Sequence, residues 1–293
     1  MLDNLYPLLD KRRSPPGQKK TRRTTVPTDL QDAKLRFQES VLAFADKRLP
    51  FRDHAPSRRR ILEPNGPYAP SNISTISGLF SALVYRGISH NTQFLLENEY
   101  FFATLSEFNV LHVQLQLDGH NADYFCNKAA YGVTTRRSVN DASTYWEKAQ
   151  NPSLNAFLTR STPVNFLRLY FLILRSKIPG FGPLTSFQLA LDYAIAKKAT
   201  MPTVKEMAHV IFKLKMGGLK GLIRLGYSVT TEHEVACALY SLRAQLDERI
   251  PTGTKKRIAF GIVFVEHLLC KFGRLDAKPF QDLEEVIASG SRL

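Results

Sequence analysis

The chain has 293 residues, 44% of them hydrophobic and 23% charged, so it is long enough to bury a substantial core. Lysine and arginine outnumber acidic residues by 40 to 26, and the resulting net charge of +14 favours a polyanionic partner such as nucleic acid. Three widely spaced cysteines do not make a disulfide framework. No apolar run approaches the ~18–20 residues needed to cross a bilayer, so no membrane partner is expected.

The basic charge is concentrated near the N-terminus. Residues 1–60 carry 15 Lys and Arg against 7 Asp and Glu, and residues 11–23 hold seven basic residues and no acidic one. Prolines and a glycine in this stretch disfavour a helix, so we predict a disordered basic arm over 1–28. Its candidate nucleic-acid contacts are Lys19, Lys20, Arg22 and Arg23. The arm resembles a nuclear localisation signal or a non-specific DNA-binding tail, and we expect a soluble, nuclear protein. A solvated tail without function is the alternative.

Helical periodicity predicts a first helix over 29–48. Residues 50–72 contain five prolines and predict a loop. This loop carries a second basic cluster of candidate nucleic-acid contacts, Arg58, Arg59 and Arg60. Further helices are expected over 74–85, 98–117 and 141–160, with a polar excursion over 118–140.

Residues 162–198 predict a helix, a tight glycine turn and a second helix. Thr162 and Pro163 are expected to begin the first helix, Pro179 follows its end, and Gly182-Pro183 begins the second. Two glycines around one apolar residue allow a tight turn and a close approach to another surface. The N–H groups at the start of the second helix suit a phosphate. Candidate nucleic-acid contacts here are Lys177, Gly180, Phe181, Gly182 and Thr185. A plain αα-corner is the alternative.

Beyond the hairpin, helices are expected after residue 203, over 230–249 with Thr231 as N-cap, and over 259–272. No run of alternating strands and no internal repeat is found. The predicted fold is therefore all-α, with one compact helical domain over 29–275 and a short C-terminal tail over 276–293.

Candidate catalytic residues are Asp192, Gln188 and Arg86. Thr185, Gln188 and Asp192 are spaced so that they share one face of the second hairpin helix. A glutamine beside an aspartate is suited to reading a flipped base or positioning a water molecule. Arg86 is suited to contacting phosphate or Asp192. The alternative for the face with Thr185, Gln188 and Asp192 is a polar face that is solvated or lies between helices, and the alternative for Arg86 is a surface helix end.

Neither a metal nor a cofactor is indicated. His233 with Cys237 and His267 with Cys270 have the spacing of paired zinc ligands, but both cysteines lie among apolar residues, where a free thiol acts as a small hydrophobe. The sequence has no Walker loop, dinucleotide fingerprint or His-Glu-x-x-His motif.

Four stretches together resemble one family. They are VYRGISHNT at 84–92, IPGFGPLTSFQLALDYA at 178–194, GGLKGL at 217–222 and VFVEHLLCKF at 263–272. Their order resembles the helical domain of 5-hydroxymethyl-deoxyuridine DNA kinases and the alpha-glutamyl/putrescinyl-thymine pyrophosphorylases, a branch similar to the helix-hairpin-helix DNA glycosylases. The resemblance covers about residues 40–275. It implies a helix-hairpin-helix fold that binds double-stranded DNA in a modified-pyrimidine modification or repair system, acting on the base or its N-glycosidic bond if active.

The sequence also departs from that family. No acidic residue lies between Asp192 and Glu206, where the glycosylases carry a catalytic aspartate, and Leu184 stands where bifunctional members have a lysine. Ser89 occupies a position where the family has an acid. Two alternatives to an enzyme therefore stay open. One is a catalytically inactive DNA-binding or adaptor module that keeps the fold only, and the other is an RNA-binding protein. Protein partners are not indicated by the sequence.

Overall fold

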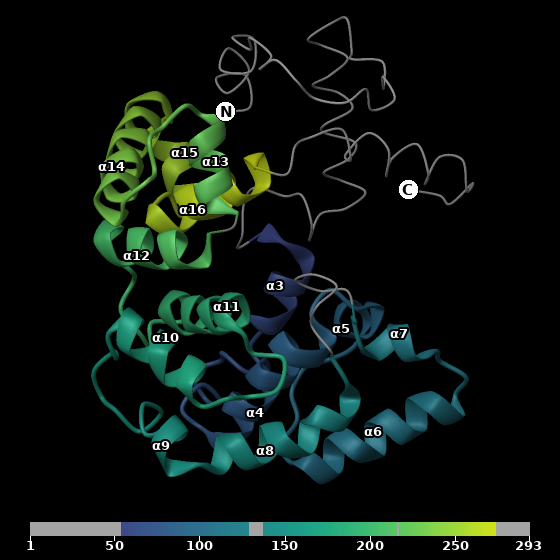
Figure 1. Ribbon diagram of the computed structural model, residues 1–293. Coiled ribbons are helices and arrows are strands. Elements are labelled where there is room, and N and C mark those ends of the chain that lie inside the picture. Colours follow the sequence, from purple (N-terminus) through teal and green to yellow (C-terminus); the bar gives the residue numbers. More distant parts are fainter. Residues whose placement is uncertain (1–53, 129–136, 216, 274–293) are drawn as a thin grey trace, which may run out of the picture. The chain divides into compact units, whose positions relative to one another are not determined.

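The computed structural model describes residues 54–128, 137–215 and 217–273 (Figure 1). This described part is all-α, which confirms the predicted fold class. Its one pairing of β type is an isolated bridge between Val164 and Ala199. The predicted arm over 1–28, the helix over 29–48 and the tail over 276–293 lie outside the described residues, as do Lys19, Lys20, Arg22 and Arg23.

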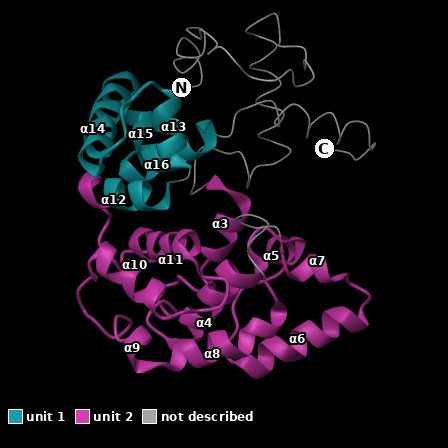
Figure 2. Ribbon diagram, in the orientation of Figure 1, with its two compact units in different colours: residues 1–52, 207–293 teal, residues 53–206 magenta. Residues whose placement is uncertain are grey.

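Contacts divide the chain into two compact units (Figure 2). The described residues up to Glu206 belong to unit 2, and those from Met207 onward belong to unit 1. The single helical domain predicted over 29–275 includes described residues of both units. No helix in the described ranges is both long and apolar enough to span a membrane.

Unit 2 contains the hairpin and most of the helices. Its elements are α3 Pro56–Ile61, α4 Ile76–Val84, η4 Tyr85–Ser89, α5 Gln93–Glu97, α6 Leu105–Leu117, α7 Ala122–Phe125, η5 Val139–Asp141, α8 Ala142–Gln150, α9 Pro152–Asn155, α10 Phe166–Arg175 and α11 Pro183–Ile195. Helix α4 packs against α8, and α10 packs against α11. The element η4 is a π-helix that continues directly from α4.

Aromatic rings fill the core of unit 2. Phe80 on α4 meets Trp146 of α8 edge to face with ring centroids 5.1 Å apart, and Phe102 and Phe108 pack around it in the same manner. Phe94 extends the cluster towards α7. Edge-to-face contacts of this kind suit the aromatic quadrupole, and the large buried area supplies most of the driving force for folding.

Unit 1 is a small helical group. Its elements are α12 Val204–Leu214, whose first residues belong to unit 2, α13 Gly218–Arg224, α14 Glu232–Arg249, α15 Thr252–Arg257 and α16 Ile262–Phe272. Thr231 caps α14 in a reciprocal capping box with Glu234, which confirms the predicted start of that helix. Helix α13 lies against α16 so closely that a Cβ on Gly221 would stand 2.4 Å from the carbonyl oxygen of Leu269. The glycine cluster around residues 217–222 therefore serves helix packing.

Two predicted boundaries were wrong. The loop predicted over 50–72 contains helix α3, because Pro56 is accommodated in its first turn. The first hairpin helix begins after Asn165 and not at Thr162. Asn165 accepts a hydrogen bond from the Arg168 N–H at 3.0 Å, whereas Val164 is held extended by its bridge to Ala199.

Candidate functional site

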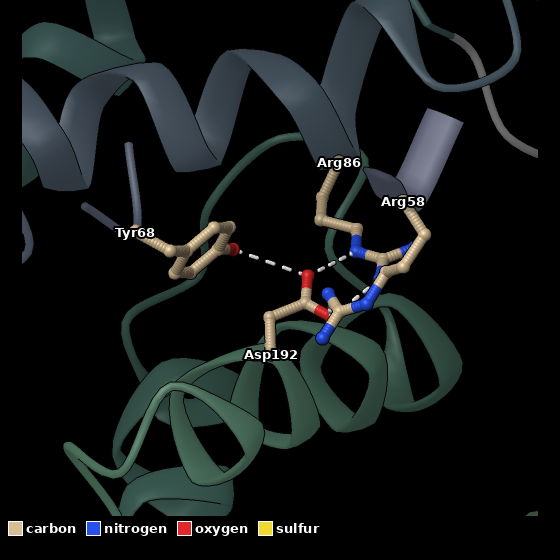
Figure 3. Close-up of polar contacts among 4 residues, drawn as sticks. All are labelled: Arg58, Tyr68, Arg86 and Asp192. Atoms are coloured by element: carbon tan, nitrogen blue, oxygen red, sulfur yellow. Dashed lines mark hydrogen bonds and ion pairs between the residues drawn. The ribbon is translucent and has the colours of Figure 1, made fainter. Parts of the chain in front are cut away.

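Four polar side chains from distant parts of the chain meet inside unit 2 (Figure 3). Asp192 on α11 receives both Nε and Nη2 of Arg86 at 2.5 Å, one to each carboxylate oxygen. Arg58 on α3 donates from Nη1 to the same carboxylate, and the Tyr68 hydroxyl donates at 3.1 Å. We call Arg58, Tyr68, Arg86 and Asp192 the Asp192 cluster. The bidentate contact of Arg86 is the geometry in which a guanidinium binds a carboxylate most strongly.

The Asp192 cluster is closed to solvent. The exposed fractions are 0% for Asp192, 2% for Arg86 and 3% for Arg58. Burial, followed by the neighbouring charge of Asp192, holds the pKa of the Tyr68 hydroxyl well above its usual value, so Tyr68 stays protonated and donates to the carboxylate. Removing one partner from such a buried group leaves an uncompensated charge, which makes the cluster sensitive to substitution.

The π-helix η4 is the element that presents Arg86. The guanidinium carbon of Arg86 lies 4.6 Å from the centroid of the buried Tyr85 ring, within the range of a cation–π contact. The next residue, Gly87, faces Tyr145 of α8, and a Cβ at Gly87 would stand 2.2 Å from the Tyr145 hydroxyl oxygen. A π-turn is uncommon and often marks a functional or tightly constrained position. Here it allows Arg86 to reach Asp192 of α11 while the small Gly87 lies against Tyr145 of α8.

The hairpin predicted over 162–198 is present. Helices α10 and α11 pack against each other and are joined by residues 176–182. Gly180 has a φ of +72°, the left-handed conformation that glycine adopts without steric penalty, which is consistent with the tight glycine turn expected here. Phe181 is buried, with its ring edge-on to Tyr145 at 5.7 Å. Tyr145 also donates from its hydroxyl to the Pro179 carbonyl at 2.9 Å, so this side chain fixes the turn.

The outer side of the turn is open. Gly182 is the exposed N-cap of α11, with a φ of −74°, and no side chain caps this helix end. A Cβ added at Gly182 would meet no atom within 4 Å. Pro183 has no N–H, and the helical hydrogen bonds begin with the Ser186 N–H to Gly182 at 3.0 Å. Lys177, at the other side of the turn, is exposed. The N–H groups of an uncapped helix start suit an anion, and Lys177 adds a cation to the same connection between the two helices.

The predicted polar face of α11 points largely inward. Thr185 is 2% exposed and Asp192 is fully buried, while Gln188 is half-buried. The predicted core positions Leu184 and Ile195 are also only half-buried. Helix α11 is thus packed on most of its circumference, because the Asp192 cluster covers the side on which a purely amphipathic helix would face water.

The basic cluster of α3 is divided between interior and surface. Arg58 belongs to the Asp192 cluster, and Arg60 donates to Glu63 at 2.8 Å and to the Leu96 carbonyl at 2.9 Å. Arg59 alone of the three is classed as exposed, with its Nη2 3.2 Å from Nδ1 of His54. The prediction that all three arginines contact nucleic acid is therefore wrong for Arg58, which is buried, and Arg59 is the one exposed cation of the three.

The cysteine and histidine pairs show no metal-site geometry. Sγ of Cys237 lies 3.6 Å from Nε2 of His233 on the exposed side of α14. Cys270 instead lies against Gly217. Across the ranges that the structure describes, no three His, Cys, Asp or Glu side chains are grouped so as to hold a metal ion.

Sequence reasoning missed Tyr68, Tyr145 and the inward role of Arg58. Tyr145 belongs to no recognisable sequence motif. Tyr68 lies in the proline-rich segment between α3 and α4, where no functional residue was expected. The pairing of Arg86 with Asp192 was one of the expected alternatives and is present. No family model, no curated protein and no solved structure matches this chain, so the resemblance to the helix-hairpin-helix glycosylase group rests on the four quoted stretches.

Proposed function

We propose that this protein is a nucleic-acid-binding helical module of the helix-hairpin-helix type, which uses the α10–α11 turn to hold a backbone phosphate of double-stranded DNA. The observation that carries this proposal is the open, uncapped start of α11 at Gly182, beside the exposed Lys177 and the left-handed Gly180. The chain's net charge of +14 supplies the long-range attraction.

The geometry favours binding over catalysis as the role of this unit. A catalytic carboxylate has to reach a substrate, whereas Asp192 is fully buried and paired with Arg86 and Arg58. We therefore assign the Asp192 cluster to the support of the hairpin: it fastens α11 to α3 and to the π-helix. The resemblance implies DNA with modified pyrimidines, so duplexes with and without a modified pyrimidine are the ligands to compare.

The direct test is Gly182→Val. Its side chain would project into open space in the free protein but would stand where a phosphate must approach the N–H groups of α11. Losing one charge-assisted contact of ~1.5–3 kcal/mol corresponds to roughly 10- to 100-fold weaker binding of a fluorescent DNA duplex, measured by anisotropy. The accompanying loss in the free energy of unfolding should stay within ~1 kcal/mol, as for other N-cap changes.

Gly261→Val is the matched control. Gly261 is also the N-cap of its helix, α16, without a side-chain cap and with an extended backbone, and its added Cβ would have one neighbour at 3.9 Å. It should change stability by a similar amount and leave DNA affinity intact. If both variants bind DNA as tightly as the parent, the turn is only a structural corner. Repeating the titration with a 5-hydroxymethyluracil duplex and with single-stranded RNA tests the modified-base setting and the RNA alternative.

A further inference from the structure

A second feature of unit 2 lies where α8 and α10 end. A surface pocket of about 370 Å³ is lined there by eight residues. Three of them are cationic: Lys148, Arg175 and Lys177. Asn151, Ser153 and Ser176 add amide and hydroxyl groups, and two leucines complete the lining. None of the eight lining residues is acidic, so the pocket presents one sign of charge. We call it the cationic pocket.

The three cations come from separate elements that the fold brings together. Lys148 belongs to the last turn of α8, Arg175 is the last residue of α10, and Lys177 follows in the hairpin turn. The Arg175 guanidinium lies 5.7 Å from the centroid of the Phe171 ring, which steadies its long side chain. In the described part of the chain, no ion pair joins any of the three to a carboxylate. Like charges gathered without a counter-charge repel one another, and an anion would relieve that repulsion.

The backbone at Lys177 ends helix α10 at the edge of the pocket. Its φ is +48°, in the left-handed region, where a side chain is disfavoured by roughly 1–2 kcal/mol. Glycine is the usual residue directly after a helix that ends in this way. Lys197 and Lys215 also follow helices with a positive φ, so this conformation belongs to the helix end; at Lys177 it sets where the side chain leaves the backbone at the pocket.

We propose that the cationic pocket is a phosphate-binding site. Several cations and hydroxyl or amide donors around one concavity match a group with multiple charged oxygens better than a carboxylate, which carries a single charge. The assignment of that phosphate to a nucleic-acid backbone rests on the proposed function, because Lys177 belongs to both the pocket and the hairpin turn. A small phosphorylated molecule is the other source of the same chemistry.

The first arm of the test uses inorganic phosphate. Amide NMR signals of Ser176 and Lys177 are followed during a phosphate titration, with sodium chloride adjusted to hold the ionic strength constant. We expect saturable shifts in the parent and roughly threefold to tenfold weaker binding in the double variant Lys148→Ala/Arg175→Ala. Arg168→Ala is the matched control, because Arg168 is an exposed arginine of the same helix α10 that does not line the pocket.

The second arm repeats the comparison with a fluorescent DNA duplex at several salt concentrations. If the pocket holds a backbone phosphate, the double variant binds DNA more weakly, and the slope of log affinity against log salt concentration falls in magnitude by about one. Arg168→Ala should change the affinity and the slope less. Loss of phosphate binding with unchanged DNA binding would support the phosphate site and assign it to a small molecule. Phosphate binding by a parent that does not bind DNA would overturn the proposed function and leave the site standing. Equal phosphate affinity in the parent and the double variant overturns the site itself.

Discussion

The Asp192 cluster and the cationic pocket use the same kind of side chain, a cationic one, in opposite ways. Both involve the α10–α11 hairpin, and each gathers more than one cation. In the cluster, Arg58 and Arg86 are buried against a shared carboxylate, whereas Arg175 and Lys177 of the pocket are exposed and face no acid among its lining residues. The difference shows that a net charge counts two populations: cations that fix the fold and cations that remain available to a partner.

These two populations should respond differently to substitution. A buried ion pair adds little net stability when compared with apolar packing, yet removing one partner is strongly destabilising. An exposed cation contributes little to folding and affects mainly a charged ligand. Stability measurements therefore report on the Asp192 cluster, and binding measurements report on the cationic pocket.

The largest expected effect is that of Asp192→Asn. The amide has nearly the size of the carboxylate, but it leaves two buried guanidinium groups without their counter-charge. We expect the free energy of unfolding to fall by about 3–5 kcal/mol, measured by urea denaturation. Glu63→Gln is the control, because it breaks the partly exposed pair with Arg60 and should cost less than ~1 kcal/mol. Similar losses in the two variants would show that Asp192 does not hold the hairpin in place.

The next effect tests the contact between the π-helix and Tyr145 of α8, the side chain that holds the hairpin turn through Pro179. In Gly87→Ala the new Cβ would lie 2.2 Å from the Tyr145 hydroxyl oxygen and 2.5 Å from ring carbons, so Tyr145 or η4 has to move. Overpacking of this kind costs about 1–3 kcal/mol. Combining it with Tyr145→Leu should recover part of that loss, giving a coupling energy in a double-mutant cycle. Strictly additive losses would mean that the two residues do not constrain each other.

A smaller effect is expected from pH. Burial and the charge of Asp192 raise the pKa of Tyr68 well above its usual value of 10.0. Above pH ~10 the unfolded chain therefore releases this proton while the folded chain retains it, so the free energy of unfolding falls as pH rises through that range. Tyr68→Phe removes one such group and should make the decline between pH 9 and 11 less steep. An unchanged slope would mean that Tyr68 ionises as readily in the folded protein as in the unfolded chain.

Local sequence signals predicted the local structure well. Thr231 with Glu234 marked the start of α14, and Gly182-Pro183 marked the start of α11, because caps and prolines act on backbone groups within one turn. The two glycines of the hairpin likewise predicted a tight turn, and one of them, Gly180, has the left-handed conformation. In each case the interaction that decides the structure lies within a few residues of the signal.

The candidate site could not be predicted to the same extent, because its contacts are distant in sequence. Arg58 and Asp192 are 134 residues apart, and Tyr68 and Asp192 are 124 apart. Neither basic clustering nor helical periodicity indicates that one arginine of α3 turns inward while its neighbour Arg59 stays exposed. The left-handed conformation of Lys177 was also missed, since lysine carries no preference for it. Such features become visible only when the packing of the helices is known.

The smallest change in stability is expected when either of two lysines is replaced by glycine, and the pair distinguishes an effect on folding from an effect on binding. Lys177 and Lys197 both follow a hairpin helix, both are exposed, and both have a positive φ, of +48° and +64°. Glycine adopts this conformation without the steric penalty, although it loses more entropy on folding, so each Lys→Gly change should raise the free energy of unfolding by no more than ~1 kcal/mol. Only Lys177 lines the cationic pocket. Lys177→Gly should therefore weaken binding of phosphate and of a DNA duplex while its stability is kept or improved, and Lys197→Gly should improve stability alone. Equal binding losses in both variants would indicate a general effect of net charge, and unchanged binding in both would assign the strain at Lys177 to helix termination only.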